Sequence, residues 1–143
     1  MKCDTDALKL DRQLCFPIYA CSHEIIKRYK PFLDEIGLTY TQYIAMMVLW
    51  EKEEISAKEL GVALHLDSGT LTPLLKRLRD MGLITKERSS ADERVLDVRI
   101  TESGKALRQK AASIPRRIRS CVELTDEEAG TLYRLLYRIL DTI

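Results

Sequence analysis

Two capped helical segments, joined by a three-residue turn, constrain the fold of this chain most strongly. Ser56–Glu59 has the capping-box pattern, in which a serine and a glutamate three positions later satisfy backbone N–H groups at a helix start. After a turn at 65–67, a second helix is expected with Asp67 or Ser68 as its N-cap. Its apolar residues recur at helical spacing: Leu71, Leu74, Leu75 and Leu78. This arrangement predicts a helix-turn-helix.

A hairpin is expected directly after these helices. Gly82 ends the second helix, and strands are predicted at 83–88 and 94–100 with a polar tip at 89–93. Apolar and polar residues alternate along the second strand. The fold class is therefore mainly α (α+β), a winged helix-turn-helix with its core at about 39–101.

Further helices flank this core. One is expected at about 8–30, either kinked near Pro17 or starting there, and Pro31 and Gly37 bracket a short connection after it. Thr39 begins a second capping box, which opens a buried central helix. We expect Pro73 to lie early in the second helix of the helix-turn-helix, where its missing N–H costs least.

The C-terminal part, about 102–143, is also predicted to be helical. Thr101 caps a helix that is kinked or restarted at Pro115, and Thr125 begins a third capping box. A chain of 143 residues suits a single domain, 1–143. The apolar stripes of the first and last helices exceed what one small winged helix can cover, so we expect these dimerisation helices to form a homodimer. A monomer with a helical cap is the alternative.

The formal net charge of +1 does not by itself indicate a nucleic-acid partner, so any such role depends on local arrangement. The chain has no run of 18 apolar residues and no signal-like N-terminus, which predicts a cytoplasmic protein with no membrane partner. Four cysteines stand at positions 3, 15, 21 and 121 without a Cys-x-x-Cys pair. Cytoplasmic thiols are normally reduced, so no structural disulfide framework is expected.

The second helix and the wing supply the candidate DNA contacts. Small residues let a helix approach bases, and basic residues reach phosphates or guanine. The candidates are Ser68, Gly69, Thr70, Thr72, Lys76, Arg77, Arg88, Asp92 and Arg94. We expect Asp92 to hold the Arg94 guanidinium by a bidentate pair, aimed at the minor groove. Lys58, Lys86 and Arg99 are interpreted as ordinary surface charges. A dimer of such heads predicts double-stranded DNA with an inverted repeat as partner.

With these features the chain resembles the multiple-antibiotic-resistance regulator (MarR) family of bacterial transcription factors. The resemblance rests on Leu66–Leu78, on Asp92-Glu93-Arg94 in the wing and on Ile100–Gly104. Within that family the chain is most similar to the organic-hydroperoxide resistance regulators. The residues that carry this closer likeness are Leu10–Phe16, Tyr29-Lys30-Pro31 and Leu38–Tyr43.

The resemblance implies a repressor that releases its operator when an organic hydroperoxide oxidises a cysteine. Cys15 matches the sensing cysteine, and Tyr29 and Tyr40 match two tyrosines that hydrogen-bond to it. Tyr19 is a further candidate for this thiolate pocket. A thiolate attacks the peroxide O–O bond and becomes a sulfenic acid, which a second thiol traps as a disulfide. Cys121 resembles the resolving cysteine of the two-cysteine type, and a low-molecular-weight thiol is the alternative trap.

The spacing of these residues adds a physical constraint. Cys15 and Tyr29 are 14 positions apart, so one continuous helix would separate them by about 21 Å. They can then meet only between two subunits whose first helices run antiparallel. Pro17 could instead leave Cys15 near a helix N-terminus, which favours a thiolate. Cys21 cannot reach Cys15 within one helix and is interpreted as a buried apolar residue, and Cys3 as a free tail thiol.

Three other functions are alternatives for this sequence. A small phenolic or aromatic ligand could bind among Tyr19, Tyr29, Tyr40, Tyr43 and Trp50. A metal-responsive regulator could use Cys21, His23 and an acidic neighbour, although this is a weak ligand pattern. A thiol peroxidase is disfavoured, because no catalytic base accompanies Cys15. We therefore expect no enzymatic activity, no cofactor and no metal.

Overall fold

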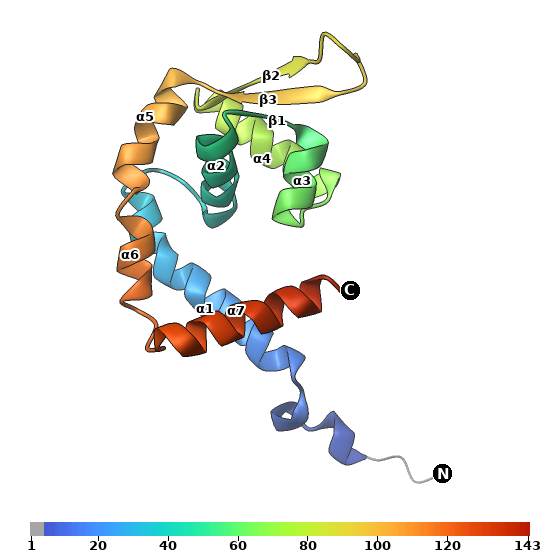
Figure 1. Ribbon diagram of the computed structural model, residues 1–143, viewed down its shortest axis with the longest axis vertical. Coiled ribbons are helices and arrows are strands. Elements are labelled where there is room, and N and C mark those ends of the chain that lie inside the picture. Colours follow the sequence, from blue (N-terminus) through green and yellow to red (C-terminus); the bar gives the residue numbers. More distant parts are fainter. Residues whose placement is uncertain (1–4) are drawn as a thin grey trace.

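The computed structural model describes residues 5–143, so Cys3 lies outside the described residues. The elements follow in chain order as two short 3-10 helices η1 (Thr5–Leu8) and η2 (Leu10–Arg12), then α1 (Cys15–Asp34), α2 (Tyr40–Lys52), β1 (Glu54–Ser56), α3 (Ala57–Leu64), α4 (Ser68–Asp80), β2 (Ile84–Arg88), β3 (Leu96–Ile100), α5 (Glu102–Ala111), α6 (Ile114–Arg119) and α7 (Asp126–Leu140). Figure 1 shows a head of α2, α3, α4 and the sheet, with α5 leading from it to α6 and α7. The predicted fold class is confirmed.

The head is built on a small antiparallel sheet with strand order β1-β3-β2. The wing strands β2 and β3 were predicted, whereas β1 falls partly in a segment that reads as a solvated turn. Its three residues contain one apolar side chain, Ile55, which is the partner of Val98 on β3. A strand this short forms by pairing with the free edge of β3. Three residues are too few to show a periodic pattern, so the sequence does not predict this strand. The core beneath the sheet includes Met46, Leu49, Leu60, Leu75, Leu78 and Ile84, all fully buried.

The predicted helix caps are present. Capping boxes begin at Thr39, Ser56 and Thr125, each with both reciprocal hydrogen bonds. Asp67 is the N-cap of α4, and its Oδ1 accepts the Thr70 N–H at 2.8 Å. At the other end of α4, Gly82 has φ 73°, a conformation that glycine adopts without a steric penalty.

The start of the first helix follows one of the two predicted alternatives, whereas its end differs from the expected range. It begins at Cys15, so it starts beside Pro17 rather than being kinked there, and Pro17 is its third residue, where a helix has no acceptor for the missing N–H. It also continues through Pro31, which was expected to end it, and stops at Asp34. The extra turn is retained because it buries Leu33, which is 2% exposed. This burial offsets the hydrogen bond that Pro31 cannot donate.

Two further prolines have different consequences. Pro73 is the sixth residue of α4, not in its first turn as predicted, so the Gly69 carbonyl lacks its usual donor four residues later. Pro115 is the second residue of α6, where it is well tolerated. The predicted long helix after Thr101 is therefore restarted at Ile114 rather than kinked.

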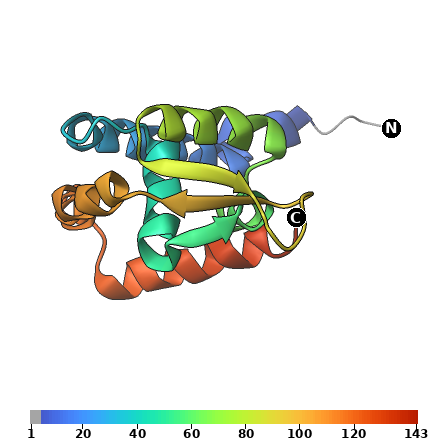
Figure 2. The ribbon, with the colours of Figure 1, turned by 90° about the horizontal axis from the view of Figure 1, so that it is seen from above.

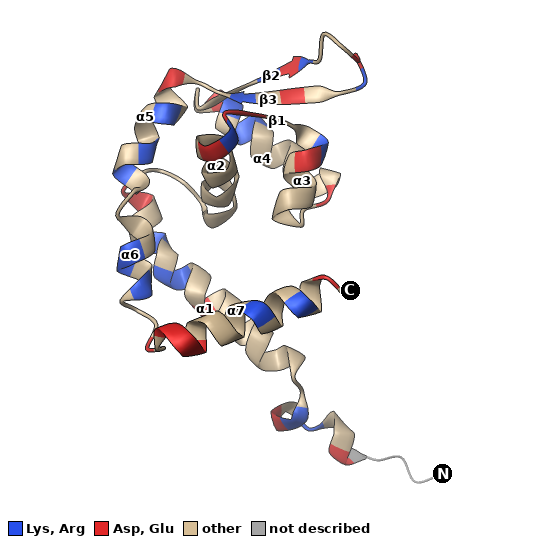
Figure 3. Ribbon diagram, in the orientation of Figure 1, with Lys and Arg blue, Asp and Glu red and all other residues tan. Residues whose placement is uncertain are grey.

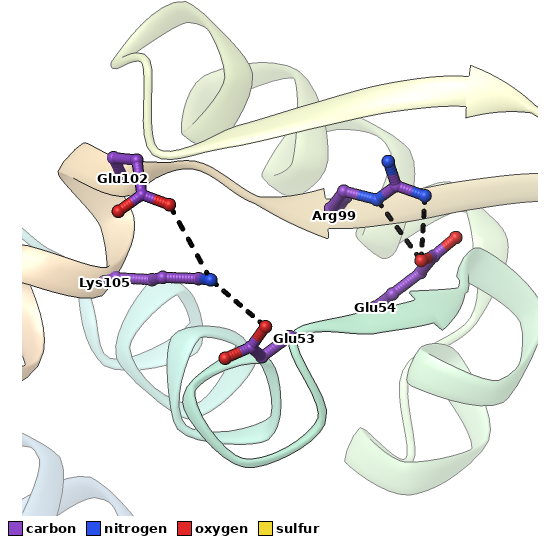
Figure 4. Close-up of polar contacts among 5 residues, drawn as sticks. All are labelled: Glu53, Glu54, Arg99, Glu102 and Lys105. Carbon is purple, nitrogen blue, oxygen red and sulfur yellow. Dashed lines mark hydrogen bonds and ion pairs between the residues drawn. The ribbon is translucent and has the colours of Figure 1, made fainter.

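The start of α5 is fixed tightly to the head. The Trp50 indole N–H donates to the Gly104 carbonyl at 2.8 Å, and the Thr101 hydroxyl donates to the Gly82 carbonyl at 2.6 Å. Ion pairs add to this joint, as Figure 4 shows. Lys105 lies between Glu53 and Glu102, with Nζ–carboxylate distances of 3.1 and 3.7 Å. The head and the first turns of α5 are thus one packed unit.

The outer helices leave much apolar surface uncovered. No residue of α7 is buried, and Leu33 is the one buried residue of α1. α1 and α7 cross in the view of Figure 1, but Figure 2 shows them on opposite sides of the molecule. Large apolar residues with a third or more of their surface exposed on or beside these two helices include Leu14, Phe16, Ile18, Ile25, Ile26, Leu132, Leu135 and Leu140. None of the helices in residues 5–143 is long and apolar enough to cross a membrane.

The joint at Gly104 makes a direct prediction about stability. A Cβ at this position would clash with the backbone carbonyl of Leu83, which cannot move without distorting the head. We expect Gly104→Ala to lower the free energy of unfolding by about 1–3 kcal/mol. Gly130→Ala is the matched control, because a Cβ there meets nothing within 4 Å and lies inside α7, and it should be neutral or stabilising. Urea unfolding of the reduced proteins measures both, and equal midpoints for Gly104→Ala and wild type would contradict the close approach.

Candidate DNA-reading head and cysteine site

The solvent face of α4 carries the predicted helix contacts. Its inner face is apolar and buried, with Leu71, Leu75 and Leu78 each less than a tenth exposed. The predicted contact residues are all exposed: Ser68, Gly69, Thr70, Thr72, Lys76 and Arg77. The first turns of α4 therefore present small, uncharged side chains, and basic residues follow further along (Figure 3). This is the arrangement that a helix entering the major groove requires.

A hollow of about 750 Å³ lies between α3, α4 and the wing. Leu71, Leu75 and Leu96 are among its apolar walls, and Lys58 and Lys86 also line it. Neither lysine has an ion-pair partner anywhere in residues 5–143, so both ammonium groups add positive charge beside α4. Arg99, in contrast, pairs with Glu54 at 2.9 Å and serves to join β3 to β1 (Figure 4).

The wing differs in one detail from the expectation. Asp92 does not hold the Arg94 guanidinium, because its Oδ1 accepts the backbone N–H of Arg94 at 2.9 Å instead. Two residues of separation favour this local turn, in which an aspartate caps the backbone just ahead of it. Arg88 is also engaged, since its Nη1 donates to the Glu93 carbonyl at 3.0 Å. Within residues 5–143 the Arg94 side chain makes no hydrogen bond or ion pair, so it is available to an outside partner.

Cys15 is the first residue of α1 and is exposed. The N–H groups of the first turn have no partner within the helix and favour negative charge nearby. Its two sequence neighbours are apolar and exposed, Leu14 by 72% and Phe16 by 41%. Cys21 is also exposed, so its interpretation as a buried residue is wrong for the single chain. The site thus combines an exposed thiol with uncovered apolar surface.

Tyr29 and Tyr40 come together as predicted, with ring centroids 4.9 Å apart, and Tyr43 joins them at 5.9 Å from Tyr29. Burial raises the pKa of Tyr29 to about 12, and the neighbouring tyrosines add to this effect. Burial also raises the pKa of Tyr40 and of Tyr43. All three hydroxyls therefore stay protonated at neutral pH and can donate hydrogen bonds. No hydrogen bond uses the Tyr29 or Tyr40 hydroxyl in the described part of the chain.

A single chain does not bring the predicted thiolate pocket together. Cys15 and Tyr29 lie on one uninterrupted helix of 20 residues, and their 14-position separation corresponds to about 21 Å. Tyr19 is one turn from Cys15 and makes an edge contact with His23 at 4.3 Å, so it does not join the other tyrosines.

Cys121 lies two residues after the end of α6 and is exposed. Its thiol donates to the Arg117 carbonyl, with the sulfur 3.4 Å from the oxygen. The Arg117 side chain holds α6 against the end of α1: it forms two hydrogen bonds to Glu35, at 2.7 and 2.8 Å, and lies 4.0 Å over the Phe32 ring. This contact was missed, because the partners are 82 positions apart and no single-sequence signal links them.

Two observations concern the alternative functions, binding of an aromatic ligand and response to a metal. A hollow of about 230 Å³ between α2, α5 and α6 has Tyr43, Trp50 and Arg108 among its lining residues. Among the residues that the structure describes, no group of three or more His, Cys, Asp or Glu side chains could hold a metal ion.

Comparison with known proteins gives consistent matches. Residues 27–111 match the family described as "Transcriptional regulator SarA/Rot". The organic hydroperoxide resistance transcriptional regulator of Bacillus subtilis is 46% identical over 96% of this chain and 94% of its own length. Among solved structures, reduced AbfR bound to DNA is 32% identical with a TM-score of 0.77, covering 97% of both chains. A disulfide-formed AbfR structure is 33% identical with a TM-score of 0.63, covering 96% of this chain and 94% of that one.

The tyrosine cluster predicts a pH effect. Tyr29 has a folded-state pKa of about 12 and an ordinary value of 10.0, so between these values the folded state holds a proton that the unfolded state has lost. The resulting stabilisation is complete below pH 10 and is lost as pH rises through about 12. Wild type should therefore lose stability more steeply than Tyr29→Phe across this window, measured by urea unfolding at several pH values. Parallel losses in the two proteins would show that Tyr29 titrates normally.

Proposed function

The chain belongs to the SarA/Rot family of MarR-type transcriptional regulators, and we propose that it is a homodimeric repressor that releases its operator when an organic hydroperoxide oxidises Cys15. The observation that carries this proposal is the place of Cys15. It is an exposed thiol at the first residue of a long helix, beside apolar side chains that suit an organic rather than an inorganic peroxide. The same chain carries a winged helix-turn-helix with an open reading face.

The proposed dimer accounts for the uncovered helices. α1 and α7 together expose an apolar surface that a second copy can bury, and few charges interrupt the first half of α1 (Figure 3). Antiparallel pairing of two α1 helices would place Cys15 of one subunit at the level of Tyr29 in the other. The protonated tyrosine hydroxyls would then donate to the partner's thiolate and stabilise it.

The proposed oxidation proceeds in two steps, formation of a sulfenic acid and formation of a disulfide. The Cys15 thiolate attacks one peroxide oxygen, the O–O bond breaks, and the products are a sulfenic acid at Cys15 and an alkoxide that takes a proton from water. The thiol of Cys121 from the other subunit then loses its proton and attacks the Cys15 sulfur. The S–O bond breaks, the hydroxide takes the proton as water, and an intersubunit disulfide remains. A low-molecular-weight thiol could perform the second step in the same way.

DNA reading rests on the two copies of α4 and the wings. The small residues at the start of α4 would approach base edges, Lys76 and Arg77 would meet phosphates, and Arg94 would enter the minor groove. Two such heads fit an inverted repeat. Oxidation would act by changing the distance between the heads, since each head would move as one unit with α5 when the outer helices shift.

In this proposal the protein works in the cytoplasm as a switch and not as an enzyme. One oxidation per subunit is sufficient, and neither a cofactor nor a metal takes part. A second candidate function is release by a small aromatic ligand. The hollow lined by Tyr43, Trp50 and Arg108 favours it, since it offers aromatic walls and a cation.

Gel-shift titration with cumene hydroperoxide tests the sensor. Wild type should bind its operator when reduced and release it when oxidised, whereas Cys15→Ser should stay bound. Cys21→Ser is the matched control, since it removes another exposed thiol from the same helix, and it should respond as wild type does. Release of the operator by Cys15→Ser after peroxide treatment would contradict the proposal. Operator binding by wild type that peroxide leaves unchanged would contradict it as well.

The anisotropy of a labelled operator, measured at several salt concentrations, tests whether the wing contacts DNA. Arg94→Ala should weaken operator binding by about tenfold or more, because an unpartnered guanidinium aimed at DNA is lost. Lys110→Ala, on the last turn of α5, is the control that removes one positive charge away from the reading face. If both variants bind equally well, the wing does not contact DNA as proposed.

A further inference from the structure

Arg117 joins three parts of the molecule at the end of α6. Its guanidinium donates to both carboxylate oxygens of Glu35, at 2.7 and 2.8 Å, and its Cζ lies 4.0 Å from the Phe32 ring centroid. Its carbonyl accepts from the Cys121 thiol at 3.4 Å and from the Ser120 hydroxyl at 2.6 Å. One residue therefore fixes the end of α1 with its side chain and the segment of Cys121 with its backbone. We call the contact of Arg117, Glu35 and Phe32 the α1–α6 clamp.

The clamp has a more defined geometry than an ordinary surface ion pair. A bidentate arginine–carboxylate pair fixes both distance and orientation, and the ring beneath the guanidinium restricts it further. The hydrogen bonds from Arg117 hold the pKa of Glu35 below its ordinary value, so the carboxylate stays charged over a wider pH range. Ile114 and Ile118, one turn apart on α6, are buried in the core that also contains Leu33 of α1. The clamp thus adds orientation to an interface that apolar burial already stabilises.

The clamp also sets the level of Cys121 along α1. Figure 1 shows α6 running beside α1 in the opposite direction, starting near the C-terminal end of α1. Cys121 follows Arg117 by four residues and lies two residues beyond the end of α6, so its segment leads back toward the level of Tyr29. In the proposed antiparallel dimer this is also the level of the other subunit's Cys15. In that dimer the resolving thiol of one subunit and the sensing thiol of the other would lie at the same level.

We propose that Arg117 is a positioning residue for the resolving step: the α1–α6 clamp holds Cys121 at the level where the other subunit's sulfenic acid forms. This inference rests on the proposed function. The clamp touches neither the peroxide nor Cys15 of its own chain, so it acts on disulfide formation and not on the first oxidation. Its partner Glu35 has the same role, because both halves of the pair are needed for the bidentate contact.

The test separates the two chemical steps in the full-length protein. After cumene hydroperoxide is added, a sulfenic-acid trapping reagent measures oxidation of Cys15, and non-reducing electrophoresis measures the cross-linked dimer. Arg117→Gln and Glu35→Gln should each slow cross-linking by about tenfold or more, since small displacements of a reacting group are costly. Sulfenic-acid formation should stay within about twofold of wild type, because the clamp is not part of the first step. A small thiol added in competition should capture a larger share of oxidised Cys15 in these variants.

Controls make the outcome decisive. Arg116→Gln removes the neighbouring charge on the same helix and should behave as wild type, since the exposed Arg116 side chain makes no hydrogen bond or ion pair among the described residues. Arg117→Lys keeps the cation but loses the bidentate geometry, so its cross-linking rate should fall between those of wild type and Arg117→Gln. Operator binding by the reduced variants verifies that they are folded. Unchanged or faster cross-linking in both clamp variants overturns the positioning role. A wild-type protein that forms no cross-linked dimer overturns the proposed Cys121 trap instead.

Discussion

The continuity of α1 is the constraint on which the sensing site depends. A single helix holds Cys15 at its first residue and Tyr29 14 positions later, and a helix cannot fold back on itself. The thiol and the hydroxyls that would stabilise it are therefore about 21 Å apart within one chain. Any site that uses both groups must be completed by a second subunit. Oxidation then acts on an interface, which is where a change in one residue can alter the relative position of two reading heads.

The joint between α5 and the head determines how a change at the α1 interface can reach the reading head. The Trp50 bond to the Gly104 carbonyl and the Lys105 ion pairs fasten the first turns of α5 to α2 and the sheet. The α5 helix ends at Ala111, and α6 starts again at Ile114. The head and α5 therefore form one body. An interface change at α1 would thus displace the whole reading head and leave α4 itself unaltered.

The parts of this structure that could be predicted are those encoded by neighbouring residues. A capping box lies within four positions, so Thr39, Ser56 and Thr125 were identified correctly, as was the alternation along β3. The incorrect predictions concern segments whose conformation depends on contacts with residues far away in the sequence. The helix continues past Pro31 because Leu33 is buried against elements far along the chain. The pairing of Tyr29 with Tyr40 followed from a family resemblance, whereas the bond between Arg117 and Glu35 had no signal in a single sequence.

The surroundings of the two proposed redox cysteines explain why they could have different tasks. Cys15 is the exposed first residue of α1 and lies between Leu14 and Phe16 in the sequence. Cys121 follows the C-terminal end of α6 and donates its S–H to the Arg117 carbonyl. In the proposed mechanism the peroxide reacts with Cys15 first. Cys121 becomes useful only after an electrophilic sulfur has formed within its reach, and that order of events is the one a disulfide switch requires.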